Sequence, residues 1–231
     1  MQQYDKAYSY SKIMIDSTTA LEEKLLQNDV DSVRLEVCSS MELDQNLMRA
    51  NHYILVDRTI KARISLATLE GLERLVRMDV RELVGITEDV FEIACKAFKK
   101  DRRFFLTVDC KEEQGHIVLR DYIKQYEAAE KIVLGCYYQE LLVGVLMAAR
   151  ISDTEYETVL GAILPEWQSK GAGMSLYAYE FHKLKEMGVK TLYSRISTDN
   201  VSSLNLHISL SKGKINFVQP LDIYIKDRQS I

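Results

Sequence analysis

The residues with the clearest chemical pattern form a short glycine-rich stretch, Gln168-Ser169-Lys170-Gly171-Ala172-Gly173. A strand-like segment precedes this stretch and a helix-like segment follows it. Successive amides in such a turn point inward together, and the positive end of the helix dipole reinforces the anion site that they form. The glycines leave room for a diphosphate against the backbone. The pattern predicts a pyrophosphate-binding turn; the alternative is a plain helix-initiating turn.

The spacing of the stretch distinguishes it from two other phosphate-binding loops. Neither G-x-x-x-x-G-K-[ST] nor G-x-G-x-x-G fits the residues around Gly171 and Gly173. A nucleoside triphosphate loop and a Rossmann dinucleotide turn are therefore not expected. In the alternative of a plain turn, Gln168 and Lys170 are solvated loop residues.

Side chains that could move a proton lie on both sides of the turn. Glu155 and Glu157 fall in a predicted strand, where a carboxylate can accept a proton from an attacking amine. Asn200 and His207 are seven residues apart in a predicted helix, so they share one face of it, and an imidazole exchanges protons near neutral pH. The alternatives are surface carboxylates, a helix N-cap at Asn200 and a packed or solvated helix position at His207.

The elements that would position these residues alternate in a mixed pattern from residue 79 onward. Thr87 offers a helix N-cap, and Pro165 ends a predicted strand just before the glycine-rich turn. The order β-α-α-β-β-β-α-β-α-β is that of a mixed α/β layered domain. The predicted strands cover 80–84, 131–138, 141–150, 155–164, 191–196 and one or two segments of 216–226, and the predicted helices cover 90–97, 117–129, 174–184 and 201–210.

The first 78 residues have a weaker pattern. They contain no glycine before Gly71, so they cannot build a second turn like the one described above. We therefore expect a small N-terminal α/β domain over residues 1–78 and a larger domain over residues 79–231. The short elements predicted in the N-terminal part are a helix over 41–50 and strands over 54–56 and 62–66.

Composition and charge narrow the class of protein. Hydrophobic residues make up 47% of the 231 residues and charged residues 28%, so the chain can bury a sizeable core without disulfides or metal. The net charge of −4 argues against a nucleic-acid partner, because nucleic-acid-binding surfaces are usually basic. No apolar run approaches the roughly 18 residues of a membrane span. We expect no nucleic acid and no membrane among the partners.

The cysteines and the N-terminus indicate a cytoplasmic protein. The four cysteines form no C-x-x-C pair and no histidine lies at a zinc-like spacing, so we expect free thiols and no metal. The first residues lack a basic stretch followed by an apolar run, so no signal peptide is expected. The four positions are Cys38, Cys95, Cys110 and Cys136.

The strand–turn–helix from Val159 to Phe181 resembles the pyrophosphate loop of the GNAT acyltransferases, whose pattern is Q/R-x-x-G-x-G/A. Ile163-Leu164-Pro165 resembles the end of the family's fourth strand, where two strands splay and backbone groups meet the pantetheine arm. Residues 188–192 resemble the approach to the fifth strand, and Asn200 follows it where the family commonly places an asparagine facing the cofactor. The resemblance covers about residues 79–226.

This resemblance implies a GNAT-type mixed central sheet flanked by helices, preceded by a smaller N-terminal α/β half that is a degenerate copy of the same fold. It also implies an N-acetyltransferase that moves an acetyl group from acetyl-CoA, as co-substrate, to a primary amine. The residues expected to bind the cofactor are Ile163, Leu164, Gln168, Ser169, Lys170, Gly171, Ala172, Gly173, Met174, Asn200 and Ser203.

The resemblance also implies catalytic roles. A backbone amide near Leu164 would polarise the thioester carbonyl. Glu157 lies in the strand where relatives often have the general base or a group that relays the proton to it, and would take that role. Relatives that acetylate amino sugars use a tyrosine seven residues after the asparagine as the acid, and this sequence has His207 there. The expected acceptor is a small amine held by variable loops, here 104–116 and 151–155.

A resemblance to one subgroup of the family indicates which kind of amine acceptor to expect first. The stretch 101–105, Asp-Arg-Arg-Phe-Phe, resembles the S-R-F-H region of the dTDP-fucosamine acetyltransferases, which act on an amino sugar carried by a nucleotide. The stretch 47–57 resembles the pattern L-x-x-x-G-F-x-x-V-D of the same group, with Asn51 where that group usually has glycine.

Two other functions fit the same pattern. The loss of the usual tyrosine at His207 is also what a non-catalytic, regulatory GNAT-like module that binds an acyl-CoA would show. An accessory protein whose N-terminal half mediates assembly is a third interpretation. The sequence does not encode the oligomeric state, and a homodimer is one arrangement that it allows.

Overall fold

The computed structural model of the chain describes residues 12–15, 21–23, 25, 34–104 and 112–226, and the side chains of 12–15 and 112–114 are outside this description. Cys110 and Phe105, both named above, lie outside the described residues.

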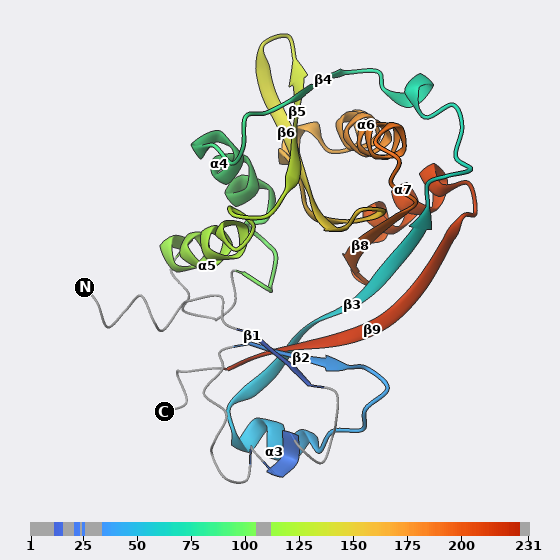
Figure 1. Cartoon of the computed structure of the whole chain (residues 1–231). Helices are drawn as coiled ribbons and strands as arrows, with labels where there is room; N and C mark the ends of the chain where they lie inside the picture. Colours follow the sequence, from blue (N-terminus) through green and yellow to red (C-terminus); the bar gives the residue numbers. More distant parts are fainter. Residues whose placement is uncertain (1–11, 16–20, 24, 26–33, 105–111, 227–231) are drawn as a thin grey trace.

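The described residues form one mixed sheet of nine strands in the order β1-β2-β9-β3-β8-β7-β6-β5-β4 (Figure 1). The β1/β2 and β7/β8 pairs are parallel and the other pairs are antiparallel. The strands are β1 Lys12–Ile15, β2 Arg34–Cys38, β3 Tyr53–Ser65, β4 Asp79–Glu82, β5 Lys131–Tyr138, β6 Leu141–Ser152, β7 Glu155–Ile163, β8 Thr191–Ser197 and β9 Ile215–Lys226.

Helices cover both faces of the sheet, and each layer encloses its own core. Helices α4 and α5 lie on one face with α6 and α7 on the other, as Figure 1 shows. Leu119 and Val145 belong to the core under α4 and α5, whereas Phe181 and Leu192 belong to the core under α6. The helices are α3 Gln45–Ala50, α4 Glu88–Ala97, α5 Glu112–Lys124, α6 Ala172–Glu186 and α7 Val201–Ser211, with short 3-10 turns η1 Glu73–Leu75 and η2 Pro165–Trp167.

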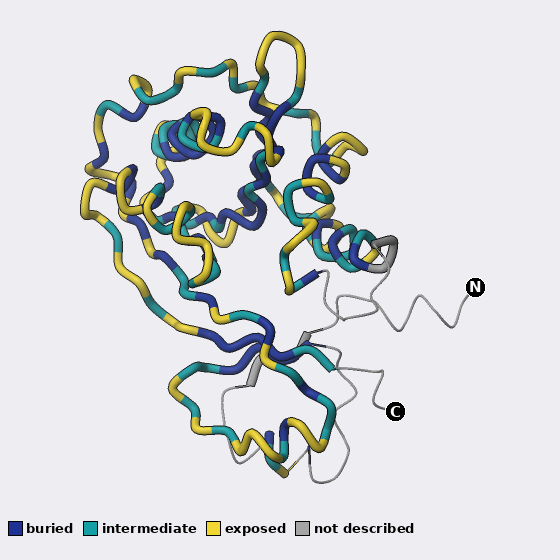
Figure 2. Tube along the Cα trace, turned by 180° about the vertical axis from the view of Figure 1, so that it is seen from behind, coloured by how far each residue is buried: buried dark blue, intermediate teal, exposed yellow. Residues whose placement is uncertain are grey.

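Two long strands connect the helix-covered part to the part that holds β1, β2 and α3. Strands β3 and β9 run side by side through both parts in Figure 1. A third core, which includes Leu35, Met48 and Tyr53, lies under α3. In Figure 2 the strands between the two helix layers are largely buried, whereas the segments around α3 are mostly exposed.

The structure refines several predicted elements. The segments 54–56 and 62–66 belong to one strand, β3, apart from residue 66 just after its end, and 216–226 is one strand, β9. The helix predicted over 117–129 begins and ends five residues earlier, at Glu112 and Lys124. Pro165 ends β7 as predicted, because a proline cannot continue the ladder and suits the first turn of η2.

The sheet is continuous across residue 78, where the sequence predicted a domain boundary. Strand β3, from the N-terminal part, is hydrogen-bonded to β8 on one edge and to β9 on the other. These pairings join residues more than 120 positions apart, for example Thr59 with Ser197. The two-domain division itself stays a prediction about folding units.

Candidate functional site

Strands β7 and β8 separate in the middle of the sheet. Their parallel pairing runs from Glu155 opposite Thr191 to Thr158 opposite Ser194 and goes no further, although β7 continues to Ile163 along β6. The separation opens a cleft of about 350 Å³ between the two strands. A gap in the middle of a sheet leaves strand edges open to a ligand, which makes this cleft the candidate site.

A β-bulge accompanies the separation. Thr158 pairs with Ala148 and Leu160 with Met147, so Val159 is an extra residue on β7. The Val159 carbonyl accepts a hydrogen bond of 2.6 Å from the Tyr122 hydroxyl of α5. Bulges bend a strand and re-aim its side chains, and they are common beside active sites.

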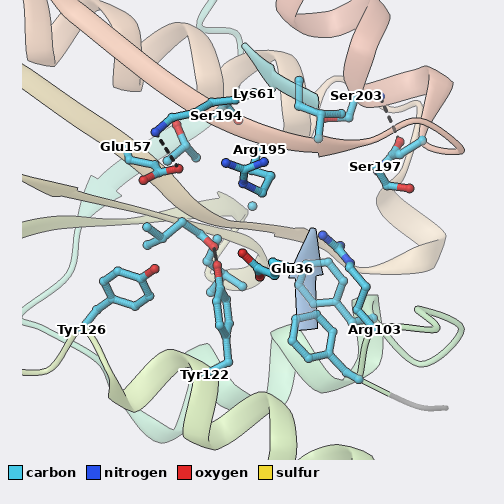
Figure 3. A pocket seen from close by; sticks show the side chains of 18 of the residues that line it. Glu36, Lys61, Arg103, Tyr122, Tyr126, Glu157, Ser194, Arg195, Ser197 and Ser203 are labelled. Carbon is cyan, nitrogen blue, oxygen red and sulfur yellow. Dashed lines mark hydrogen bonds and ion pairs between the residues drawn. The ribbon is translucent and has the colours of Figure 1, made fainter. Parts of the chain in front are cut away.

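The face of the cleft toward α5 is lined by charged and phenolic side chains. Glu157 of β7 makes an ion pair of 3.7 Å with Lys61 of β3. Arg195 of β8 projects into the space between these strands and the helix (Figure 3). From the helix side the cleft is closed by Tyr122 and Tyr126. Such a set can hold a polar acceptor and take a proton from it.

Residues 99–103, which include four basic side chains, contribute Arg103 to this cleft. Arg103 donates to Asp101 and lies 3.4 Å from the carboxylate of Asp57. Burial opposes the charge of the Arg103 guanidinium, but these carboxylates still raise its pKa. Arg103 is therefore committed to an internal ion-pair network.

The opposite face of β7 holds a buried acid. The Thr158 hydroxyl donates a 2.6 Å hydrogen bond to Oε1 of Glu180 in α6. Oε2 of Glu180 has no hydrogen-bond partner among the described residues. Burial raises the pKa of Glu180 to about 8, and the hydrogen bond from Thr158 offsets only part of this rise. Glu180 is therefore largely protonated at neutral pH.

The glycine-rich turn lies where β7, through η2, leads into α6. Ser169 and Gly171 both have positive φ, 65° and 93°, and a Cβ on Gly171 would meet nothing within 4 Å. No side chain among the described residues caps α6, so the first amides of the helix, at Ala172, Gly173 and Met174, remain available to a ligand. An exposed helix N-terminus with free amides is an anion site.

Other predicted cofactor residues have partners within the fold. The Leu164 amide donates to the carbonyl of Val143 at 3.0 Å, so the predicted polarising amide near Leu164 would have to be another one. The Ile163 carbonyl accepts a 3.4 Å hydrogen bond from the Gln168 amide group. The Lys170 ammonium lies 4.9 Å from the centre of the Trp167 ring.

Two predicted cofactor residues line the cleft on α7. Asn200 and Ser203 both border it. Asn200 also caps α7, since its side-chain oxygen accepts a 3.0 Å hydrogen bond from the Ser203 amide. The N-cap alternative is therefore confirmed, and the cleft position is compatible with a cofactor contact as well.

Residues 88–210, a little over half of the chain, match the sequence profile of the family described as "Acetyltransferase (GNAT) family". The chain belongs to the GNAT acetyltransferase family. No curated protein sequence matches it. The comparisons give no support to the dTDP-fucosamine subgroup resemblance.

Solved structures share the GNAT fold at low identity. A functionally unknown conserved protein from Staphylococcus epidermidis is 13% identical, with a TM-score of 0.60 over 92% of this chain and 82% of that one. A putative GNAT acetyltransferase from Novosphingobium aromaticivorans is 13% identical, with a TM-score of 0.52 over 93% and 84%. A tandem GNAT protein from the clavulanic acid biosynthesis pathway is 12% identical, with a TM-score of 0.57 over 89% and 68%. These likenesses confirm the predicted fold class.

The geometry of this GNAT protein does not favour the predicted acid role of His207. The ring is fully buried and does not line the cleft. Nδ1 lies 2.7 Å from the Ser203 carbonyl, so it carries the proton, and Nε2 has no partner among the described residues. Burial lowers the pKa of His207, so the ring is neutral near pH 7 and its one N–H proton is already bonded.

Tyr177 lies between His207 and the cleft. The two rings meet edge to face with centroids 4.9 Å apart, and Tyr177 borders the cleft. Its hydroxyl lies so close to Gly161 of β7 that a Cβ there would fall 2.0 Å from it. Burial raises the pKa of Tyr177, so its hydroxyl keeps its proton. Tyr177 therefore lies at the boundary between core and cleft.

Substitutions can distinguish the catalytic roles of His207 and Tyr177. His207→Leu should leave kcat within about threefold, because it removes a ring that lies behind Tyr177, whereas Tyr177→Phe should lower kcat by about tenfold or more by removing the hydroxyl alone. For both variants, kcat is measured as the release of the CoA thiol from acetyl-CoA in the presence of an amine that the wild-type protein acetylates. A 100-fold loss in His207→Leu with normal Tyr177→Phe would restore the original assignment.

Sequence reasoning missed most of the acceptor side of the cleft. Among the residues whose side chains are described, none of 115–116 or 151–155 lines it, and of 104–116 the described contribution is Phe104. The missed residues come from strand faces, from α5 and the turn after it, and from α6. Alternation along 193–197 and the pair of tyrosines four residues apart are the local signals that could have pointed to them. The missed residues are Arg34, Glu36, Lys61, Tyr122, Tyr126, Tyr177 and Arg195.

Metal-binding groups and membrane-spanning helices are both absent from the described residues. Among the described residues no group of three or more His, Cys, Asp or Glu side chains is arranged to hold a metal ion. Within the same residues no helix is both long enough and apolar enough to cross a membrane.

Proposed function

We propose that this protein transfers an acetyl group from acetyl-CoA to the primary amine of a small acceptor. The observation that carries the proposal is the separation of β7 and β8 after Thr158 and Ser194, close in sequence to a helix N-terminus with free amides. One ligand could place its phosphates at α6 and its reactive end between the strands.

The residues at the turn fit the diphosphate of CoA. Gly171 adopts a left-handed φ of 93° with open space where a Cβ would stand, and the amides of Ala172, Gly173 and Met174 are not used by a cap. A dianionic group there would satisfy these donors and the helix dipole together. When bound, acetyl-CoA supplies an activated acetyl thioester.

The chain's own residues supply the proton transfers. An ammonium group cannot attack a thioester, so its proton must leave first, and Glu157 is placed to accept it on the α5 side of the cleft. Tyr177 reaches the cleft from the opposite face of β7, where its hydroxyl can donate to a departing sulfur. The β-bulge at Val159 lies between these two groups.

A non-catalytic acyl-CoA-binding module is the alternative function. It would need the turn at 168–173 but no polar acceptor side to the cleft. Glu157, Lys61 and Arg195 on the α5 face favour the enzyme. An amino sugar on a nucleotide carrier remains one acceptor class to test, although a cleft of about 350 Å³ favours a smaller one.

The second expected result tests the cofactor assignment. Gly171→Asp should weaken acetyl-CoA binding about tenfold or more, because a carboxylate would face the diphosphate at the helix N-terminus. Isothermal titration calorimetry with acetyl-CoA measures the change directly.

Gly213→Asp is the matched control. Gly213 also has positive φ, 79°, with open space around its Cβ position, so it carries the same backbone strain away from α6. Equal binding by both variants, or no binding by the wild-type protein, would overturn the assignment.

A further inference from the structure

Arg195 is placed at the point where β7 and β8 separate. Its neighbour Ser194 makes the last parallel pair with Thr158, so Arg195 is the first β8 residue past the separation. It is half-buried and borders the cleft together with Glu157. Figure 3 shows its guanidinium in the middle of the cleft, between Glu157 and Ser197.

The partners of Arg195 leave most of its donors unused. Nη1 lies 3.5 Å from the Thr59 hydroxyl and 3.5 Å from the Gln219 carbonyl, both at the limit of a hydrogen bond. Gln219 has a left-handed φ of 48° in an irregular stretch of β9. Among the described residues no carboxylate pairs with Arg195, and neither Nε nor Nη2 has an acceptor.

The other cations of the cleft are paired with carboxylates. Arg34 lies 3.0 Å from Glu36, Lys61 lies 3.7 Å from Glu157, and Arg103 donates to Asp101. The contrast marks Arg195 as the cation for which the described chain supplies no counterion.

The register makes this arrangement costly for the fold alone. Lys61 of β3 stands directly opposite Arg195 of β8 in an antiparallel pair, so two positive charges share one face. Like charges directly opposite each other destabilise a sheet, and a half-buried guanidinium without a counterion adds a desolvation cost. A bound anion would relieve both.

We propose that Arg195 binds an oxyanion group, carboxylate or phosphate, on the amine acceptor, so that the substrate class is small amines that carry an acidic group. A guanidinium presents a planar fork of N–H donors that matches such groups, often with two parallel bonds. This inference rests on the proposed acetyl transfer, since it names the acceptor of that reaction.

The distance to Glu157 sets the size of this acceptor. Glu157 pairs with Tyr193, two residues before Arg195 on the same face, so the two Cα atoms are about 8 Å apart from strand spacing and rise. Both side chains reach into the cleft, which leaves a few bonds between the amine and the anion. Burial raises the pKa of the Tyr126 phenol, and the charges of Glu157, Glu36 and Arg195 also act on it.

The third expected result comes from matched acceptor pairs with the full-length wild-type protein. The pairs are lysine with cadaverine, 4-aminobutyrate with its carboxamide, and glucosamine 6-phosphate with glucosamine. The acidic member of at least one pair should have the higher kcat/KM by about 10- to 100-fold, as expected for charge-assisted hydrogen bonds. The carboxylate and phosphate pairs distinguish the two sources of the anion.

Arg195→Gln should remove this preference. It should lower kcat/KM for the acidic acceptor by about 10- to 100-fold more than for its neutral partner, mainly through KM. A loss of folding would lower both, so the ratio isolates recognition. Arg74→Gln, at a side chain that is 86% exposed on η1, is the control and should keep the wild-type ratio.

The failure of this inference differs from the failure of the proposed function. Equal kcat/KM within every pair, or an unchanged ratio in Arg195→Gln, would overturn the assignment of Arg195 while leaving acetyl transfer intact. No turnover of any amine would overturn the proposed function. In that case acceptor binding is read by calorimetry with CoA present, and binding of the acidic members to wild type but not to Arg195→Gln still supports the anion site, whereas its absence overturns it.

Discussion

Replacing Glu157 with glutamine is expected to lower kcat for acetyl transfer by about 100- to 1000-fold, with little change in the binding of acetyl-CoA. The carboxylate lies in the cleft beside the point where β7 and β8 separate, and a neutral amide there cannot accept a proton from the attacking amine. Glutamine has nearly the same shape, so the cleft keeps its form. Steady-state kinetics with an accepted amine, together with calorimetry for acetyl-CoA, measure the two effects separately.

Glu155→Gln is the matched control for this result. Glu155 lies two residues earlier on the same face of β7, accepts a 3.2 Å hydrogen bond from the Tyr193 hydroxyl, and does not line the cleft. Its kcat should stay within about threefold of the wild-type value. The assignment of Glu157 as the base is wrong if both variants lose the same activity, or if Glu157→Gln remains fully active at neutral pH.

Replacing Glu180 with glutamine is expected to stabilise the protein by about 2 to 3 kcal/mol at pH 7. Burial raises the pKa of this carboxyl to about 8 in the folded chain, whereas an unfolded chain ionises it near its ordinary value of 4.5. Folding at pH 7 must therefore keep a proton that the unfolded chain has released. Glutamine keeps an oxygen for the Thr158 hydroxyl and carries no such cost.

The pH dependence of the same variant gives the sharper test. The folded form binds the proton more tightly, so the contribution of Glu180 lowers stability progressively as pH rises from about 4.5 toward 8 and then levels off. The advantage of Glu180→Gln over the wild type should therefore be small at pH 4.5 and grow up to about pH 8. Urea unfolding at a series of pH values measures it.

Glu186→Gln, on the same helix, controls for a general effect of charge removal. Glu186 is exposed and lies 3.5 Å from His182, so its loss should change the free energy of unfolding by less than about 0.5 kcal/mol. An advantage of Glu180→Gln that is equal at pH 4.5 and pH 8 would show that Glu180 is not protonated by burial in the folded state.

The sequence by itself determined the features that depend on neighbouring residues. Pro165 ends β7 and Asn200 caps α7, as predicted, and Gly171 takes a left-handed backbone where the predicted turn leads into α6. Each of these outcomes follows from the conformational preference or hydrogen bonding of a few adjacent residues. For the same reason the turn at 168–173 could be predicted to bind an anion before its surroundings were known.

Tertiary structure decided which side chains meet in the cleft. Arg195 stands opposite Lys61 only because β3 is inserted between β8 and β9, a pairing of residues far apart in the chain that no local pattern specifies. The helix period placed Asn200 and His207 on one face, but α7 packs against α6, so that face leads from the cleft at Asn200 to the core behind Tyr177 at His207. Periodicity predicts which residues share a face, whereas the packing of distant elements decides what each part of that face contacts.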